Sequence, residues 1–281
     1  MRFGFTTFAT IGLSVLMLSG VAFAAPNSLN ELPPPPSKQE LQAIRKEKQD
    51  AGEEGKSALP IDIRNDAMKE SALSYGARGG LNWRTYYIRQ EMESRARYMD
   101  KVFDFHQLLI AAPSGLLIEP PVIGESADAM IIDQGGLEAA VADRVYNIGR
   151  NARIVSAART WRMYLERQWG EVSPPPDILL PVNKEEQKKW DAWFDKGWEA
   201  GVAQADEIFQ ADLNKLSSDY QGMVRYRTLL AQGMVSPPYA LQVDRGVTGG
   251  GNEMRVGDRN VSITGLPSLQ TGTQEWLPAN R

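Results

Sequence analysis

The sequence contains no cysteine and only one histidine, His106, among its 281 residues. Without cysteine there are no disulfide bonds, thiolate nucleophiles, zinc–thiolate sites or iron–sulfur clusters. A metal site built on imidazole needs several histidines, and a Ser-His-Asp triad would have to use His106. An all-oxygen cage is the other way to bind a metal. The composition therefore disfavours catalysis, and we expect a protein that is not an enzyme, with no catalytic residue, no metal ligand and no cofactor.

A strong charge imbalance is also missing. The chain has 31 Lys and Arg residues against 35 Asp and Glu residues, which gives a formal net charge of −4. The basic side chains are spread singly among acidic ones, so no basic stripe is available to follow a phosphate backbone. We therefore expect no direct nucleic-acid binding. Hydrophobic residues make up 42% of the chain, which is typical of a soluble globular protein.

A long uncharged run occurs only at the N-terminus. Arg2 is followed by a stretch without charge from Phe3 to Ala25, and Ala22-Phe23-Ala24 is a small-x-small pattern. This arrangement is typical of a secretory signal peptide over residues 1–24, with cleavage between Ala24 and Ala25. An uncleaved anchor is the alternative, because the run is just long enough to span a bilayer.

Within this segment, Leu18-Ser19-Gly20-Val21 is similar to the Leu-Ser-Gly-Cys lipobox of bacterial lipoproteins. Val21 stands where the lipid-bearing cysteine would be, so a thioether-linked diacylglycerol cannot form there. The match is either a lipobox remnant or a chance combination of common residues.

Residues 25–60 are expected to form a flexible linker. Pro33-Pro34-Pro35-Pro36 favours an extended polyproline conformation. Ser37-Lys38-Gln39-Glu40 is a capping box that opens a short helix, but the few apolar residues after it make that helix marginal on its own. The arm is either a tether or partner-docking segment, or simply disordered chain.

Residues 61–281 are predicted to form an α+β domain, mainly α, with long amphipathic helices and a small antiparallel β element. Apolar residues at steps of three and four predict helices at about 62–75, 81–105, 152–169 and 185–231. Glycines at 76–80 are expected to separate the first two. The last helix has either a break at one of its glycines or acts as an unbroken spine.

Short strands are predicted at about 116–148 and 253–265. Gly257-Asp258 is a two-residue hairpin signal. The strings Val141–Ile148 and Val256–Ile263 resemble each other, and from this we infer that the two distant stretches share one small sheet.

Two further patterns have competing interpretations. Thr248-Gly249-Gly250-Gly251-Asn252 resembles a phosphate-binding loop but lacks the following Lys-Ser/Thr, so a tight turn is favoured. Four tryptophans gather in thirty residues, and they form either the core, a sugar-stacking platform or interface anchors, with core packing as the default. These are Trp169, Trp190, Trp193 and Trp198.

Five separate motifs, in order and at similar spacing over about residues 60–280, resemble the DotC/TraI family. They are Tyr75–Arg84, Thr160–Leu165, Leu179–Pro181, Met234–Pro238 and Gly246–Arg255 continuing into Asp258-Arg259. The resemblance implies an outer-membrane-core component of type IVB secretion and conjugation machines. Family members are typically lipoproteins that assemble with DotD-like and DotH-like partners into a periplasmic ring.

The expected function is therefore a structural scaffold subunit of such a core complex, in a channel for DNA or protein transfer. The alternative is a periplasmic peptidoglycan-binding protein or cell-wall hydrolase. Because Val21 replaces the lipidated cysteine, we expect release into the periplasm and peripheral association with the outer membrane through partners, including copies of the chain itself. The candidate interface residues are Arg78, Trp83, Arg84, Trp161, Gly249, Gly250, Gly251 and Arg255.

Overall fold

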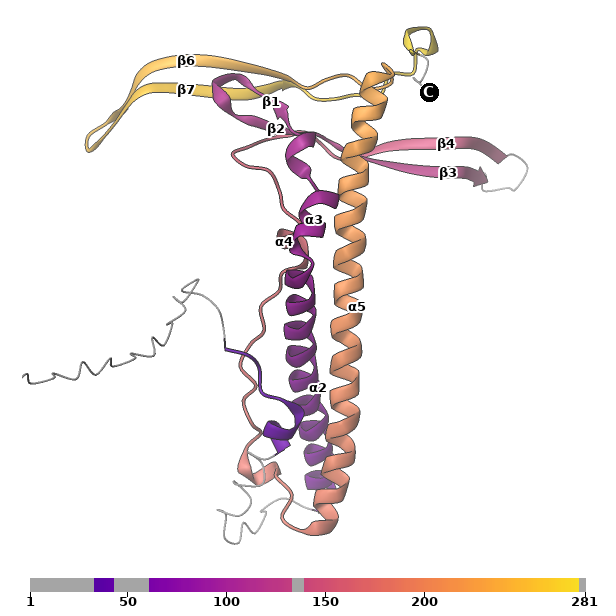
Figure 1. The fold of residues 1–281 in the computed structure, drawn as a ribbon, viewed down its shortest axis with the longest axis vertical. Helices are drawn as coiled ribbons and strands as arrows, with labels where there is room; N and C mark the ends of the chain where they lie inside the picture. Colours follow the sequence, from indigo (N-terminus) through magenta and orange to yellow (C-terminus); the bar gives the residue numbers. More distant parts are fainter. Residues whose placement is uncertain (1–32, 43–60, 133–138, 278–281) are drawn as a thin grey trace, which may run out of the picture. The chain divides into compact units, whose positions relative to one another are not determined.

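The computed structural model describes residues 33–42, 61–132 and 139–277 (Figure 1). Its named helices and strands belong to one compact unit, residues 34–281. The predicted cleavage residues Ala24 and Ala25 lie outside the described residues, as does the lipobox remnant at Leu18, Ser19, Gly20 and Val21.

The described chain is mainly helical, with about 50% helix and 26% strand, and its sheets are small and antiparallel, which confirms the predicted fold class. The α-helices are α2 (Ile61–Ser94), α3 (Ala96–Val102), α4 (Arg162–Leu165) and α5 (Lys184–Ala231). The strands are β1 (Ile110–Ala111), β2 (Leu117–Glu119), β3 (Val122–Ile132), β4 (Ala139–Arg150), β5 (Arg153–Val155), β6 (Tyr239–Gly250) and β7 (Glu253–Gly265). Short 3₁₀ helices are η1 (Phe105–Leu108), η2 (Pro113–Gly115), η3 (Asp177–Leu179) and η4 (Thr273–Glu275).

Helix α5 is an unbroken spine, which resolves the alternative that the sequence left open. It begins after Asn183, whose side-chain oxygen accepts hydrogen bonds from the backbone N–H groups of Glu185 and Glu186. This cap satisfies two of the N–H groups that a helix start leaves unpaired. The 48 residues of α5 extend for roughly 70 Å at 1.5 Å per residue.

Helices α2 and α5 lie side by side and run parallel (Figure 1). Arg64 pairs with Glu186 near the start of both helices, and Arg84 pairs with Asp206 further along. Both pairs join residues that are 122 positions apart, so the two helices stay in register.

The close approach of these helices explains why glycines occur at 76–80. The prediction that these glycines separate two helices was wrong. A methyl group at Gly76 or Gly80 would collide with backbone atoms of α5, and one at Gly197 or Gly201 would collide with backbone atoms of α2. The glycines remain helical because the absence of Cβ atoms lets the backbones meet. The helices predicted at 62–75 and 81–105 are thus α2, running on to Ser94, followed by the short α3.

The prediction of a helix over 152–169 is also wrong. Residues 153–155 form β5, which pairs with β2, and only Arg162–Leu165 is helical. Trp161, Leu165 and Trp169 are buried as expected, but they come from a short helix and irregular chain. Apolar residues spaced by four predict a helix. The same spacing does not show that arginines of this segment form ion pairs with acidic side chains distant in the sequence.

The sheets differ from the prediction in their pairing. β4 pairs with β3, and β7 pairs with β6, so residues 139–148 and 254–264 belong to separate two-stranded ribbons. The turn between β6 and β7 lies at Gly251-Asn252, not at Gly257-Asp258. Gly257, with φ of 73°, lies instead where the register of β7 shifts. A β-bulge needs a left-handed residue as much as a turn does, so the sequence signal is the same.

Part of the predicted flexible linker is docked on the helix pair. The capping box is present: the backbone N–H of Ser37 donates to Glu40 Oε2 at 2.6 Å, and that of Glu40 donates to Ser37 Oγ at 3.3 Å. Leu41, which follows it, is only 1% exposed and packs in the core with Tyr75. The α2–α5 pair supplies the partner that this short helix lacks on its own.

Candidate interaction surfaces

Aromatic side chains fill the core between α2 and α5. Trp190 and Phe194 are fully buried, Trp198 is 8% exposed, and Trp193 packs against them partly buried. Trp198 also contacts Trp83, with ring centroids 5.8 Å apart. The tryptophan cluster is therefore core, as the default interpretation predicted, and a sugar-stacking platform would need these faces open.

A network of charged groups fixes the base of the β3–β4 ribbon to α5. Glu119, at the end of β2, is 2% exposed and accepts hydrogen bonds from Arg153 at 3.0 Å and Arg159 at 2.9 Å. Arg150, the last residue of β4, lies 3.5 Å from Glu119 and donates to Asp219 of α5 at 2.9 Å. Two carboxylates thus hold three guanidinium groups, so each buried carboxylate has a positive partner and one positive charge is in excess.

Asp219 remains ionised in this network. Burial raises the pKa of its carboxyl, but hydrogen bonds from Tyr164 and Arg150 and the positive charges of Arg150 and Arg159 outweigh that effect and hold the pKa below its usual value. The same contact acts on Tyr164, where burial and the hydrogen bond to Asp219 raise the pKa of the phenol. The cluster is a structural joint in which each charged side chain has an ion-pair partner, while Glu119 Oε1 and the Nε and Nη2 atoms of Arg150 are buried without a hydrogen bond to the described residues.

Beyond this joint, the β3–β4 ribbon exposes apolar side chains. Met130 is 59% exposed and its cross-strand partner Val141 is 70% exposed. Val145, nearer the base, is 41% exposed. Residues directly opposite in an antiparallel pair share a face, so Met130 and Val141 form one apolar pair on the surface of a two-stranded ribbon.

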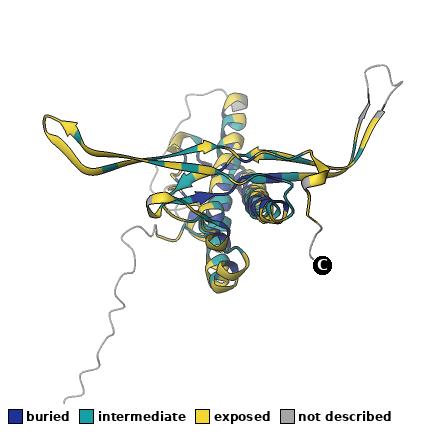
Figure 2. Cartoon of the chain, turned by 90° about the horizontal axis from the view of Figure 1, so that it is seen from above, coloured by how far each residue is buried: buried dark blue, intermediate teal, exposed yellow. Residues whose placement is uncertain are grey.

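The β6–β7 ribbon is exposed along much of its length (Figure 2), and it carries more exposed apolar side chains than β3–β4 does. Val247 and Val256 are paired across the strands and are 63% and 73% exposed. Met254, paired with Gly249, is 73% exposed on the same face. Nearer the base, the exposed apolar side chains are Tyr239, Leu241 and Val243.

These two ribbons are the candidate interaction surfaces of the chain. Contiguous exposed apolar side chains are unusual on a monomer and mark sites of contact with other molecules. Each strand has only one neighbour among the described strands, so each ribbon also presents backbone edges without a strand partner there.

Comparison with known proteins assigns the chain to a family. A family model described as "Type IV secretory system, conjugal DNA-protein transfer" matches residues 62–278, which is more than three quarters of the chain. The chain belongs to the TraI family of type IV secretory systems. The resemblance to the DotC/TraI family is thereby confirmed, and the protein is a component of type IV secretion or conjugal transfer. No curated protein matches it.

The predicted interface residues of this TraI-family chain do not gather in one place. Arg84 and Trp83 face α5, where they contact Asp206 and Trp198, and Arg78 is exposed on α2 with its Nε donating to the backbone oxygen of Ser74. These motif residues hold the helix pair or lie beside it.

Trp161 is 3% exposed, and its Nε1 donates to Asp100 Oδ1 at 2.7 Å. The guanidinium of Arg162 lies 4.4 Å from the Trp161 ring centre. Trp161 therefore connects the chain after β5 to α3, as a core side chain.

Gly249, Gly250, Gly251 and Arg255 lie together at the tip of the β6–β7 ribbon, where all four are exposed. Gly251, with φ of 61°, occupies the first central position of the two-residue connection, where a type II′ turn places glycine. Arg255 pairs with Glu253 on its own strand at 2.8 Å. These four residues lie on the β6–β7 interaction surface, next to the apolar side chains that sequence reasoning missed.

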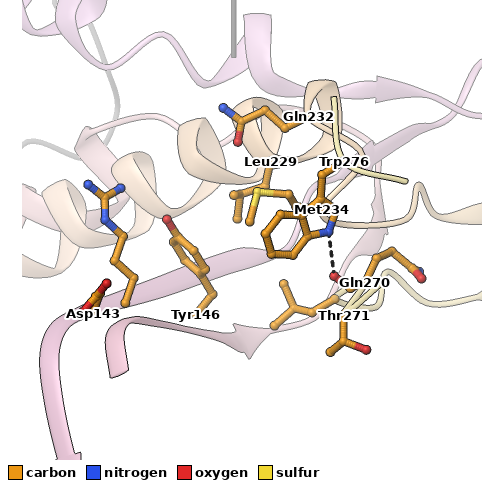
Figure 3. A pocket seen from close by; sticks show the side chains of 10 residues that line it. Asp143, Tyr146, Leu229, Gln232, Met234, Gln270, Thr271 and Trp276 are labelled. Carbon is orange, nitrogen blue, oxygen red and sulfur yellow. Dashed lines mark hydrogen bonds between the residues drawn. The ribbon is translucent and has the colours of Figure 1, made fainter. Parts of the chain in front are cut away.

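A pocket of about 640 Å³ lies where the β3–β4 ribbon meets the end of α5 and the C-terminal segment (Figure 3). Tyr146, Leu229, Met234 and Trp276 supply apolar walls, and the Trp276 indole donates to the backbone oxygen of Gln270 at 3.1 Å. The pocket has the size of a small-molecule or side-chain site.

Two sequence features carry little chemistry in the structure. His106 is exposed on η1, and its backbone N–H donates to Asp104 Oδ1 at 3.0 Å. Within residues 33–42, 61–132 and 139–277, no group of three or more His, Asp or Glu side chains is arranged to hold a metal ion. Over the same residues no helix has the length and apolarity needed to cross a membrane.

Proposed function

We propose that this TraI-family chain is a structural scaffold subunit of the outer-membrane core complex of a type IVB secretion or conjugation system. The observation that carries the proposal is the pairing of exposed apolar side chains across the two β-ribbons, Met130 with Val141 and Val247 with Val256. The helical body buries Trp190, Phe194 and Trp198 in a core of its own, whereas the apolar pairs of the ribbons have no cover within the described residues, so the ribbons gain from contact with another protein.

The joint at Glu119 supports this role mechanically. A ribbon that transmits contacts between subunits must keep its direction relative to the body, and the network of Glu119, Asp219 and their arginines fixes its base at four elements. Arg225 of α5 adds a second fastening, since it donates to Glu125 Oε2 at 2.9 Å and to the backbone oxygen of Ile123 at 2.6 Å.

We further propose DotD-like and DotH-like subunits as partners, together with copies of the chain itself, and a periplasmic location with peripheral attachment to the outer membrane. The cleavage pattern at Ala24 and Ala25, and the absence of a lipid-bearing residue at Val21, support release and attachment through partners. Mass spectrometry of the mature N-terminus tests this, because a retained or lipid-modified N-terminus would contradict it.

The alternative, a peptidoglycan-binding or hydrolytic protein, required Trp190, Trp193 and Trp198 to be exposed together. Trp190 and Trp198 are buried, and Trp193 packs against the same core. The burial of these rings favours the scaffold over the cell-wall role.

The scaffold role is tested in a strain whose copy of the gene is deleted. We expect loss of conjugal or effector transfer with unchanged cell-wall composition, and co-purification of core subunits when the wild-type chain is restored. Replacing Val247 and Val256 by Thr and Met254 by Lys should abolish both transfer and co-purification. Ile63→Thr with Ile178→Thr, which alters exposed apolar residues away from the ribbons, is the matched control. Full transfer without the chain would contradict the proposal.

A further inference from the structure

Each ribbon carries an apolar pair close to charged side chains that have no ion pair, and these unpaired charges differ in sign between the two ribbons. On β3–β4, Asp128 and Asp143 lie between the paired residues Ala127–Arg144 and Ala129–Ala142. Both carboxylates are exposed, and among the described residues neither has a hydrogen bond or ion pair. Asp128 has a left-handed φ of 49°, so the two residues are not a regular cross-strand pair, but they place two negative charges on the same short stretch of the ribbon, and this favours the arrival of a cation.

The β6–β7 ribbon offers that cation. Arg245 is exposed beside the register shift at Gly246, and it forms no hydrogen bond or ion pair with the described residues. The other arginines of the ribbon are engaged, because Arg255 pairs with Glu253 and Arg259 with Asp244. Arg245 is thus the guanidinium on this ribbon that remains available.

Charge and apolar pair are also spaced alike on the two ribbons. Met130 follows Asp128 by two residues and Val247 follows Arg245 by two residues, and on both ribbons the backbone is irregular at this point, with φ of 49° at Asp128 and register shifts on both sides of Gly246. A ribbon laid against the other can therefore match apolar pair with apolar pair while the carboxylates meet the guanidinium. One guanidinium has donors enough to serve both carboxylates.

We propose that the β3–β4 ribbon of one copy packs against the β6–β7 ribbon of a second copy of this chain. Met130 and Val141 would then be covered by Val247, Met254 and Val256 of the second copy. The contact joins two different surfaces, so it is heterologous, and repeating it gives a closed ring or an open filament. This inference rests on the proposed scaffold function and names the contact between like subunits.

Symmetric alternatives are disfavoured by the same charges. Two β3–β4 ribbons brought together would oppose four unpaired carboxylates, and two β6–β7 ribbons would oppose two unpaired guanidinium groups. Like-charge contacts of this kind disfavour the wrong pairing, which leaves the pairing of unlike ribbons.

The absence of cysteine makes a clean cross-linking test available. The full-length chain carrying both Met130→Cys and Val256→Cys is expressed in a strain with the complete transfer system and treated with a short bis-maleimide. We expect a ladder of covalent oligomers. Either substitution alone should give no cross-link, and co-expression of the two single variants should give dimers that do not grow. Ile63→Cys with Met163→Cys, both on exposed side chains, is the matched control and should give no ladder.

Charge reversal tests the pairing independently. Asp143→Lys alone or Arg245→Glu alone should lower the cross-linked fraction about fivefold, the size expected for one surface charge pair. Combining the two reversals in one chain should restore the ladder.

The outcomes separate this inference from the scaffold function. If the cysteine pair gives no ladder while the same chain still supports transfer and co-purifies with core subunits, the ribbon pairing is wrong and the scaffold role stands. A dimer from Met130→Cys alone would also overturn it, since that reports a symmetric contact. If the chain is dispensable for transfer, the scaffold role itself is wrong.

Discussion

The helix pair and the β-ribbons differ in how much of their apolar surface they bury. In α2 and α5, glycines let the backbones touch and aromatic side chains fill the remaining space, so little apolar surface is left at the contact. In the ribbons, Met130, Val141, Val247 and Val256 remain well exposed. The helix pair buries an aromatic core of its own, whereas the ribbons leave their cross-strand apolar pairs exposed.

The joint at Glu119 connects these two regions, and breaking it should have the largest effect on stability. Glu119→Gln keeps the shape but leaves the partly buried guanidinium groups of Arg150 and Arg159 without their carboxylate, so we expect a loss of about 2–4 kcal/mol in the free energy of unfolding. Chemical denaturation measures it. Glu253→Gln, in an exposed pair with Arg255, is the control and should change stability by less than about 1 kcal/mol. An equal effect of both substitutions would refute a buried joint.

A second change acts on the helix pair alone. In an isolated helix, Gly→Ala is stabilising by about 1 kcal/mol. At Gly201 the added methyl meets backbone atoms of Ala77 and Leu81, so we expect Gly201→Ala to destabilise the protein by about 1–3 kcal/mol. Gly170→Ala, where a Cβ meets no atom within 4 Å among the described residues, should be nearly neutral. Thermal melts of the two variants compare them, and a more stable Gly201→Ala would show that the helices are not in close contact.

Acidification should weaken the joint more than the ribbons. The pKa of Asp219 is lowered in the folded protein, so the unfolded state binds more protons as the pH falls. Its stabilising contribution is present above the ordinary carboxyl pKa of about 3.9 and is lost as the pH falls through the lower, folded value. The difference in unfolding free energy between wild type and Asp219→Asn should therefore be constant near neutral pH and shrink below about pH 4. A difference that grows on acidification would contradict this sign.

Sequence patterns predicted the helical body well where one face had to be buried. The periodic apolar residues predicted a helix over 185–231, and the structure has α5 at Lys184–Ala231. The error at 76–80 came from glycine itself, because its sequence signal is the same for a helix break as for a tight helix contact. A helix break and a tight helix contact can be distinguished only when the position of the second helix, which is distant in the sequence, is known.

The joint and the ribbons were harder to predict. Glu119 and Asp219 are 100 residues apart, and the arginines at 150 and 159 lie between them, so each is an ordinary charged residue until the fold brings them together. The strand β6 was missed because its residues, Tyr239–Gly250, lie in a ribbon without a buried face, where alternation of apolar and polar residues is not enforced. The sequence signal that was available for the ribbons was the apolar composition of Ala139–Val141 and the valines of β6–β7. Such a composition is equally typical of a strand buried in the core and of a strand that contacts another protein.

The smallest change in stability is expected on the ribbons, and it tests the comparison most directly. Val247→Thr with Val256→Thr removes apolar surface that is 63% and 73% exposed, so the free energy of unfolding should stay within about 0.5 kcal/mol of wild type. The same variant should nonetheless fail to assemble, since the contact with a second molecule loses its apolar pair. Chemical denaturation and sedimentation of the envelope complex measure the two effects separately. A variant that loses stability but still assembles would reverse the roles assigned to the two regions, because the valines would then belong to the body's own core.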